Sequence, residues 1–258
     1  MPGEITSIEL LSREVRKLSK IRDEKSLIYR GHGAQSFKLL PHVGRYSPPE
    51  SEDDKADDSQ LDPTRTEKVR RGKVNEQLML ELFRRRSIGY VIPGDLDDWE
   101  LLAIAQHHGM ATRMLDWTRS PLVALYFAVC REFEAWDKEK KCFKEEDAEI
   151  LVWRSPKTTL KKEPPSESPF DLGGEEFIKY IPRIVTPRLR VQSGLLTVHG
   201  DPTAEFKPPE GITRLRIPYG KRKALKQSLY RHGIDEAVLF PDVDGLARHI
   251  NWLKTDCY

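Results

Sequence analysis

The sequence predicts an α/β protein of the α+β kind, with one central mixed sheet and flanking helices. Short apolar runs bounded by turn residues, typical of strands, alternate with segments whose apolar residues recur every three or four positions, as in amphipathic helices. No segment repeats at a fixed period. The 258 residues, 38% of them hydrophobic, can bury a sizeable core but are near the upper size of one domain. We therefore expect a single domain over residues 1–258, with its core at about residues 22–255.

Local patterns predict the outer elements. Thr6-Ser7-Ile8-Glu9 can form a capping box, which predicts a first helix, and residues 27–30 have the composition of a short strand. Further strands are predicted at residues 149–153, 180–185, 194–199, 213–217 and 236–240. Further helices are predicted at residues 221–230 and 244–253.

Residues 67–86 predict a half-buried helix with arginines and lysines on its outer side. Its buried face would consist of Val74, Leu78, Leu82 and Phe83. The basic stretch 65–86 is either a solvated face balanced by the acidic residues before it, or a surface for a nucleic-acid or protein partner. The net charge of +2, from 43 basic and 41 acidic residues, gives no global attraction to nucleic acid, so such binding would be local.

Two segments are too polar to pack into a core. We expect a mobile acidic insertion at residues 46–66 and a flexible linker loop at residues 154–172. The three cysteines lack the paired spacing of a zinc site, and an odd number does not suggest a disulfide framework. There is no basic-then-apolar leader and no run near the roughly 18 apolar residues that suggest a membrane span. We therefore expect a cytoplasmic protein that is not bound to a membrane.

Residues 97–129 predict two helices joined by a turn. Asp97 can cap the first helix, and Gly109 can end it in the left-handed conformation. The histidine pair 107–108 would then lie at its C-terminal end. Ser120, which is followed by a proline, can cap the second helix.

Three separated segments resemble the FRG-domain family. They are Leu27-Ile28-Tyr29-Arg30-Gly31-His32 followed by Leu39-Leu40-Pro41, then AQHHGMATRMLDWTRSPLVALYFAV, then LFPDVDGLA. The family is named for Phe-Arg-Gly, and Tyr29 keeps the aromatic ring. A strand followed by aromatic-Arg-Gly is also similar to the first strand of ADP-ribosyltransferases, in which the arginine helps to hold the pyrophosphate or ribose of NAD. The resemblance therefore implies, as expectations, an ADP-ribosyltransferase-like fold and activity, with NAD as the candidate cofactor.

Arg30 ends the first predicted strand and is followed by two nearby glycines. A planar guanidinium can bind phosphate or pyrophosphate bidentately, and glycines let a ligand approach the backbone. The resemblance also implies a late strand whose glutamate stabilises an oxocarbenium-like transition state. Residues 190–194 would occupy that place, with Gln192 as a ribose contact and Gly194 in place of the glutamate. Gln192 is uncharged, so it cannot stabilise the positive charge of that transition state as a glutamate would.

The resulting candidates come from all of these motifs. The candidate catalytic residues are Arg30, Gln192, His107 and Asp116. The candidate ligand-binding residues are Tyr29, Arg30, Gly31, His32, Gln106, His108, Thr112, Arg113, Trp117, Ser120 and Tyr126. Trp117 or Tyr126 would stack on a flat ring. A catalytic carboxylate could also come from Glu175, Glu176 or Glu236.

Each candidate has a structural alternative. Arg30 could be a buried ion-pair partner of Asp116, the histidine pair could serve only to end a helix, and Trp117 could be a core indole. No metal site is expected, because adjacent histidines on a helix point about 100° apart. The sequence thus leaves two functions open: a nucleotide-binding cleft of the NAD type, with or without transferase activity, and a non-enzymatic module that binds nucleic acid or protein.

Overall fold

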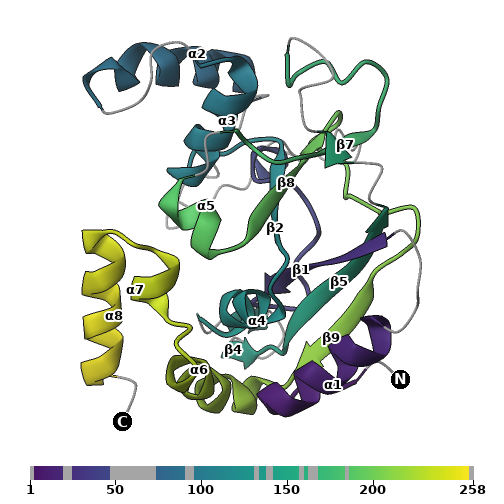
Figure 1. The fold of residues 1–258 in the computed structure, drawn as a ribbon, viewed down its shortest axis with the longest axis vertical. Coiled ribbons are helices and arrows are strands. Elements are labelled where there is room, and N and C mark those ends of the chain that lie inside the picture. Colours follow the sequence, from purple (N-terminus) through teal and green to yellow (C-terminus); the bar gives the residue numbers. More distant parts are fainter. Residues whose placement is uncertain are drawn as a thin grey trace, which may run out of the picture.

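A seven-stranded mixed sheet organises the chain, as Figure 1 shows. The computed structural model describes residues 3–19, 25–46, 74–90, 96–130, 134–137, 142–156, 160–161, 168–183 and 186–255. The strand order is β6-β7-β8-β2-β1-β5-β9, and all neighbours are antiparallel except β6 and β7. The predicted mixed α/β sheet is therefore confirmed.

The described elements have the following bounds. The strands of the large sheet are β1 (Lys25–His32), β2 (Met114–Thr118), β5 (Ala148–Pro156), β6 (Leu160–Lys161), β7 (Phe177–Tyr180), β8 (Gly194–His199) and β9 (Thr213–Ile217). A separate hairpin consists of β3 (Glu134–Asp137) and β4 (Cys142–Glu145). The helices are α1 (Ile8–Ser19), α2 (Glu76–Arg86), α3 (Asp98–His107), α4 (Pro121–Val129), α5 (Pro187–Val191), α6 (Arg222–Arg231), α7 (Glu236–Leu239) and α8 (Val243–Thr255). Short 3₁₀ turns lie at η1 (Val43–Arg45), η3 (Ser87–Gly89) and η5 (Tyr219–Lys221).

The capping signals in the sequence identified the helices around the site correctly. Asp97 accepts a hydrogen bond from the Glu100 amide at the start of α3, and Ser120 accepts one from the Val123 amide at the start of α4. Gly109 follows α3 with a φ of +91°, in the left-handed region that its lack of a Cβ permits.

Two predicted strands are wrong. Residues 236–239 form the helix α7 instead, because Asp235 caps it by accepting from the Val238 amide. The strand predicted at residues 180–185 ends at Tyr180. Short apolar runs do not distinguish a strand from a helical turn, and a side-chain cap decided the first case.

The buried face of α2 also differs from the prediction. Leu78 and Leu82 are 49% and 42% exposed, and Leu80 is buried instead. The helix begins at Glu76, whose carboxylate is buried against Arg113, and this ion pair sets which side of the helix faces inward. Residues 67–73 of the predicted helix lie outside the described part of the chain.

The two polar segments are described only in part. Residues 154–156 extend β5, and β6 pairs in parallel with β7, so the predicted linker 154–172 contains regular structure. Except for Tyr46, the predicted insertion 46–66 lies outside the described residues.

Two groups of helices cover one face of the sheet and enclose separate cores. The group of α1, α4 and α6 packs on β1, β5 and β9 through residues such as Tyr29 and Ile150. The other group centres on α3, which packs on β2, β7 and β8 through residues such as Met114. Alternate residues of the same strands, among them Trp117 and Trp153, form a third cluster on the opposite face. Figure 1 shows α3 and α5 on one half of the molecule and α1, α4 and α6 on the other.

The two halves of the sheet meet at a single strand pair. β1 pairs with β5 along eight residues, but with β2 only at Tyr29 and Thr118. Beyond that pair Arg30 and Gly31 have no β2 partner. The two strands therefore separate at the C-terminal end of β1, and the gap lies between the two groups of helices.

Gly31 holds β1 against α4 at the edge of this opening. A Cβ on Gly31 would lie 2.1 Å from the Ala124 carbonyl oxygen and 2.6 Å from the Ala128 nitrogen. The sequence predicted that this glycine admits a ligand, but the space a side chain would take is filled by α4.

We expect Gly31→Ala to lower the free energy of unfolding by more than about 3 kcal/mol, because the added methyl meets backbone atoms that cannot move independently. Urea unfolding measures this. Gly220→Ala is the matched control: no atom lies within 4 Å of its Cβ position, and its effect should stay within about 0.5 kcal/mol. Equal stability of the two variants would contradict this packing.

Candidate functional site

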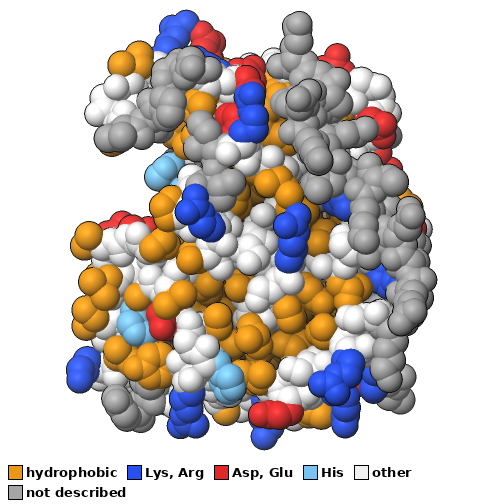
Figure 2. Space-filling model, viewed as in Figure 1, with side chains coloured by type: hydrophobic (Ala, Val, Ile, Leu, Met, Phe, Trp, Pro, Cys, Tyr) orange, Lys and Arg blue, Asp and Glu red, His pale blue; other side chains and the backbone are white. Residues whose placement is uncertain are grey.

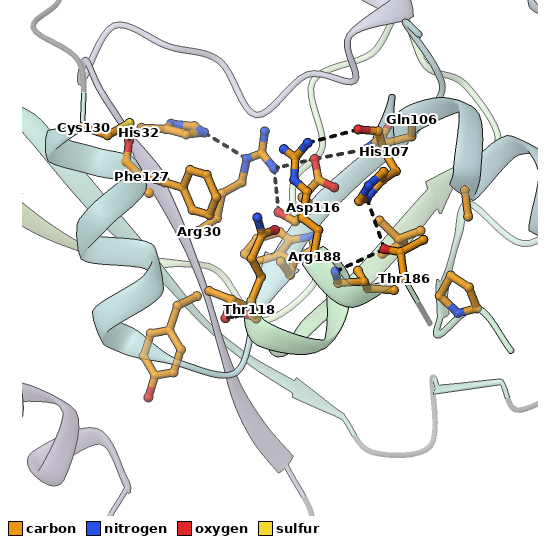
Figure 3. A pocket seen from close by; sticks show the side chains of 18 of the residues that line it. Arg30, His32, Gln106, His107, Asp116, Thr118, Phe127, Cys130, Thr186 and Arg188 are labelled. Carbon is orange, nitrogen blue, oxygen red and sulfur yellow. Dashed lines mark hydrogen bonds and ion pairs between the residues drawn. The ribbon is translucent and has the colours of Figure 1, made fainter. Parts of the chain in front are cut away.

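A cavity of about 290 Å³ lies where β1 and β2 part. Its walls come from β1, β2, α3, α4, α5 and η1, and Figure 3 shows the side chains that point into it. In the space-filling view the outline of the molecule is indented on the left, between the half with α3 and the half with α8 (Figure 2). Nine candidate residues line it, namely Tyr29, Arg30, Gly31, His32, Gln106, His107, Asp116, Trp117 and Gln192.

Arg30 spans the gap between the two strands. Its Nη1 donates to the Asp116 carbonyl oxygen at 2.5 Å and lies 4.0 Å from the Asp116 carboxylate. Its Nε faces His32 Nε2 at 3.4 Å. Burial lowers the pKa of the guanidinium, while Asp116 raises it. The contact with Asp116 that the sequence offered as a structural alternative is thus present, and the side chain also lines the cavity.

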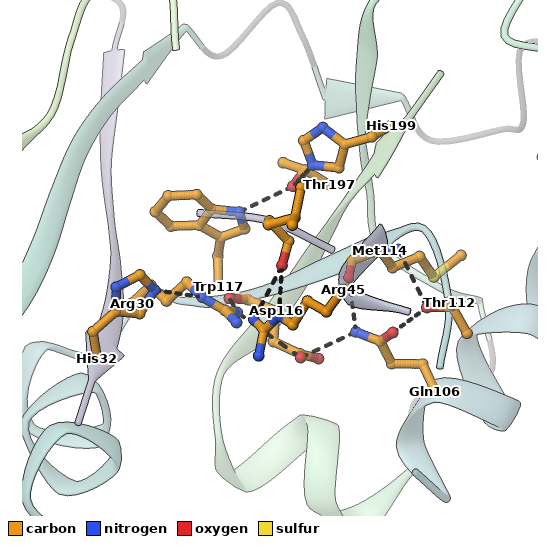
Figure 4. Close-up of polar contacts among 11 residues, drawn as sticks. Arg30, His32, Arg45, Gln106, Thr112, Met114, Asp116, Trp117, Thr197 and His199 are labelled. Carbon is orange, nitrogen blue, oxygen red and sulfur yellow. Dashed lines mark hydrogen bonds and ion pairs between the residues drawn. The ribbon is translucent and has the colours of Figure 1, made fainter. Parts of the chain in front are cut away.

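The carboxylate of Asp116 is held from the α3 side. Gln106 Nε2 donates to Asp116 Oδ2 at 3.0 Å and also reaches the Met114 carbonyl at 3.4 Å. The Thr112 hydroxyl donates to the other end of the Gln106 amide, which fixes the amide orientation (Figure 4). Thr112 is fully buried, so it supports the site from behind. The Asp116 side chain itself is 66% exposed and available to a ligand.

His107 is a neutral group at the opposite wall. Its Nδ1 lies 3.2 Å from the Thr186 hydroxyl, and its carbonyl accepts from Arg188 Nη1 at 3.0 Å. Burial lowers the pKa of His107 to about 4, with Arg188 and His108 acting in the same direction. A group with this pKa is a weak base near neutral pH, so His107 is suited to hydrogen bonding more than to proton abstraction.

The walls carry more positive than negative charge. The guanidinium groups of Arg30, Arg45 and Arg188 line the cavity, while Asp116 is the one carboxylate among the described lining residues. Arg45 donates to the Leu40 carbonyl through Nε and Nη2 at 3.2 and 3.0 Å. Such a surface favours an anion.

Sequence reasoning missed Arg45, Thr186 and Arg188. A signal for the last two was present, because Thr186 followed by Pro187 is the start of a helix, and Thr186 accepts from the Leu189 amide at 3.2 Å. Arg45 ends the short 3₁₀ turn η1, which no such signal marks in the sequence.

Gln192 lines the cavity, but not from a strand. It ends α5, its Nε2 donates to the Leu239 carbonyl at 2.9 Å, and its own carbonyl accepts from the Thr118 hydroxyl at 2.6 Å. The expected glutamate position two residues later, Gly194, is the first residue of the late strand β8, where it pairs with Thr118 of β2. Within the described part of the chain no glutamate lines the cavity, and Glu236 instead pairs with Arg248 at 2.5 Å.

The predicted ring-stacking residues belong to the core. Trp117 lines the cavity, but it is 2% exposed, its indole Nε1 donates to Thr197 Oγ1 at 3.1 Å, and it packs in the cluster on the opposite face of the sheet. Tyr126 is buried in the α4 core and lines a separate small hollow. Phe127, the next residue of α4, lines the cavity, as does Phe37. Neighbouring helical residues point about 100° apart, so one of the two faces the core when the other faces the site.

Of the remaining candidates, Arg113, Ser120 and His108 lie outside the cavity lining, whereas Tyr29 is part of it. Arg113 pairs with the buried Glu76 at 2.8 Å, and Ser120 caps α4. His108 is exposed at the end of α3. The Tyr29 side chain is 3% exposed in the α4 core, where burial raises its pKa to about 12.

Within the described part of the basic stretch, two arginines of α2 have acidic partners. In α2, Arg84 pairs with Asp98 at 2.5 Å and Arg85 pairs with Glu81. A nucleic-acid or protein partner at residues 65–86 stays a prediction. Among the described residues there is no cluster of three metal-ligating side chains, and none of the helices has the length and apolar character needed to cross a bilayer.

Comparison with known families identifies the segment that carries most of the site. The family model described as the FRG domain matches residues 25–137. The chain contains an FRG domain. The matched segment includes β1, α3, β2 and α4, so it supplies Arg30, Gln106, Asp116 and Phe127. Arg188 and Gln192 lie beyond the matched FRG segment and complete the cavity. No curated protein and no solved structure matches this chain.

His199, the last residue of β8, should make the stability of the fold depend on pH. It lies 2.8 Å from the Thr197 hydroxyl and is 4% exposed, and burial, followed by Arg30 and Arg113, lowers its pKa to about 3. Since an unfolded histidine titrates near 6.5, the unfolded chain binds the proton first as the pH falls, and stability present above pH 6.5 is lost below it.

We expect His199→Gln to reduce the slope of unfolding free energy against pH between 6.5 and 4 by about 1.4 kcal/mol per pH unit, because the substitution removes this histidine's proton uptake. Parallel curves for the two proteins, measured by urea unfolding, would exclude this contribution.

Proposed function

We propose that the FRG domain binds an anionic nucleotide-type ligand in the cavity between Arg30 and Asp116, with NAD as the first candidate. The observation that carries this proposal is the lining of three guanidinium groups around a single carboxylate. The cavity volume of about 290 Å³ is at the lower end of the sizes typical of small-molecule sites.

The cationic side suits a phosphate or pyrophosphate. Arg30 and Arg188 approach from opposite walls, and each uses one Nη1 proton on a backbone carbonyl. Their remaining N–H groups can donate to phosphate oxygens, and guanidinium–phosphate contacts are stronger than neutral hydrogen bonds.

The polar side suits the hydroxyl groups of a ribose. The Asp116 carboxylate accepts from Gln106 and has further acceptor sites. The neutral His107 lines the same cavity and can also form hydrogen bonds (Figure 3). Phe127, with apolar neighbours such as Leu189 and Leu196, offers a face for a flat ring.

Transfer chemistry would depend on Asp116. Cleavage of the bond between nicotinamide and ribose builds positive charge on the sugar, which a nearby carboxylate stabilises. Asp116 is the one described carboxylate that lines the cavity, so it is our candidate for this role in place of the expected glutamate.

We expect isothermal titration to detect binding of NAD or ADP-ribose, and Arg30→Ala to weaken it by about 10- to 100-fold, because a charge-assisted contact with phosphate is lost. Arg16→Ala, which removes an exposed guanidinium from α1, is the control and should leave the affinity unchanged. Absence of binding by the intact protein at millimolar ligand would refute the proposal.

Nicotinamide release separates an enzyme from a binder. If the intact domain releases nicotinamide from NAD, we expect Asp116→Asn to lower the rate by about 100-fold or more, while NAD affinity changes by less than about 3-fold. The asparagine keeps the shape and can still bond to Gln106. An unchanged rate would exclude Asp116 as the catalytic carboxylate, and no release by either protein would identify a binding domain.

A further inference from the structure

A row of buried polar side chains lies behind Arg30. His32 and Glu149 are directly opposite each other on β1 and β5 and are 4% and 1% exposed. His32 Nδ1 lies 3.4 Å from Glu149 Oε1, and Arg214 donates to the same oxygen at 2.5 Å. On the other side of the ring, Arg30 Nε faces His32 Nε2 at 3.4 Å, a contact drawn in Figures 3 and 4.

The donors in this row determine where the imidazole proton lies. A guanidinium can only donate, so the nitrogen that faces Arg30 must present its lone pair. The proton of the neutral ring is then on Nδ1, which faces the Glu149 carboxylate at 3.4 Å without a hydrogen bond of standard geometry. Burial lowers the pKa of His32, which keeps the ring neutral at neutral pH. The Arg30 contact thus requires this tautomer, and the nearby Glu149 carboxylate favours it.

This contact decides which edge of the guanidinium faces the cavity. With Nε directed at His32 and Nη1 at the Asp116 carbonyl, the donors that remain are on the outer edge formed by Nη1 and Nη2. Within the described residues, Nη2 makes no hydrogen bond and no ion pair. That outer edge carries two parallel N–H groups, the arrangement that binds two oxygens of one phosphate.

We propose that His32, held by Glu149, is a positioning residue that orients Arg30 so that its Nη1–Nη2 edge faces a phosphate-type anion. The binding of a phosphate-type anion rests on the proposed function, whereas the contacts among Arg30, His32 and Glu149 do not depend on it. His32 was predicted from the sequence to contact the ligand, and its role here is to act through Arg30.

Nuclear magnetic resonance on the intact chain tests the row without any ligand. Long-range nitrogen–proton spectra at pH 7 should show His32 with its proton on Nδ1, and the Arg30 Nε–H should exchange slowly with water. His32→Phe keeps a buried ring but removes the acceptor, so it should make the Arg30 Nε–H exchange rapidly. A proton on Nε2, a doubly protonated ring or an unchanged Arg30 signal in the variant would overturn the proposal.

Titration with ADP-ribose tests the consequence for binding. We expect His32→Phe to weaken binding about tenfold, because the guanidinium loses its fixed orientation. His232→Phe, on an exposed histidine at the end of α6, is the matched control and should bind as the intact protein does. Equal affinity of His32→Phe and the intact protein would overturn the positioning role. If the intact protein binds no ADP-ribose, the proposed function fails, and the resonance experiment alone decides whether the row exists.

Discussion

The parting of β1 from β2 is the constraint on which the site depends. A closed sheet would leave no room beside Arg30, because the backbone of the two strands would pair and fill the space. Here they pair only at Tyr29 and Thr118, and beyond that point the Asp116 carbonyl accepts from a guanidinium rather than from a β1 amide. A charged side chain thus takes the place of a strand contact, and it does so at the wall of a cavity. The Arg30 guanidinium therefore both links the two halves of the sheet and contributes to the positive charge of the site.

The distribution of carboxylates explains why the cavity remains positive. The buried carboxylates lie elsewhere and have arginine partners: Glu76 with Arg113, Glu149 with Arg214, and Glu100 with Arg183. The arginines of the cavity lack such close partners within the described residues, and the nearest approach is the 4.0 Å between Arg30 and Asp116. Because burial also keeps His107 and His199 neutral, positive charge in the site comes from guanidinium groups alone among these side chains. This arrangement separates groups that stabilise the fold from groups that can meet an anion.

Local signals predicted most elements near the site, and their failures have a common cause. Asp97, Ser120 and Gly109 act through hydrogen bonds or backbone freedom within a few residues, so the sequence shows them directly. The short segments that became α5 and α7 have apolar residues compatible with strand or helix, and their caps were the deciding feature. Of the candidate site, Arg30, Gln106, His107, Asp116 and Gln192 do line one cavity. Trp117 and Tyr126 were predicted to stack on a ligand, but an aromatic residue in an apolar segment fits the core equally well.

By itself, the sequence determined the helices with strong caps, the mixed α/β class and the FRG motif that carries Arg30 and Asp116. Only the tertiary structure decided that Arg188 joins Arg30 across the cavity, that Phe127 rather than Tyr126 faces it, and that His32 stands behind Arg30. The physical reason is that caps and turns depend on neighbours along the chain, whereas cavity lining, charge pairing and the protonation of a buried histidine depend on residues brought together by packing.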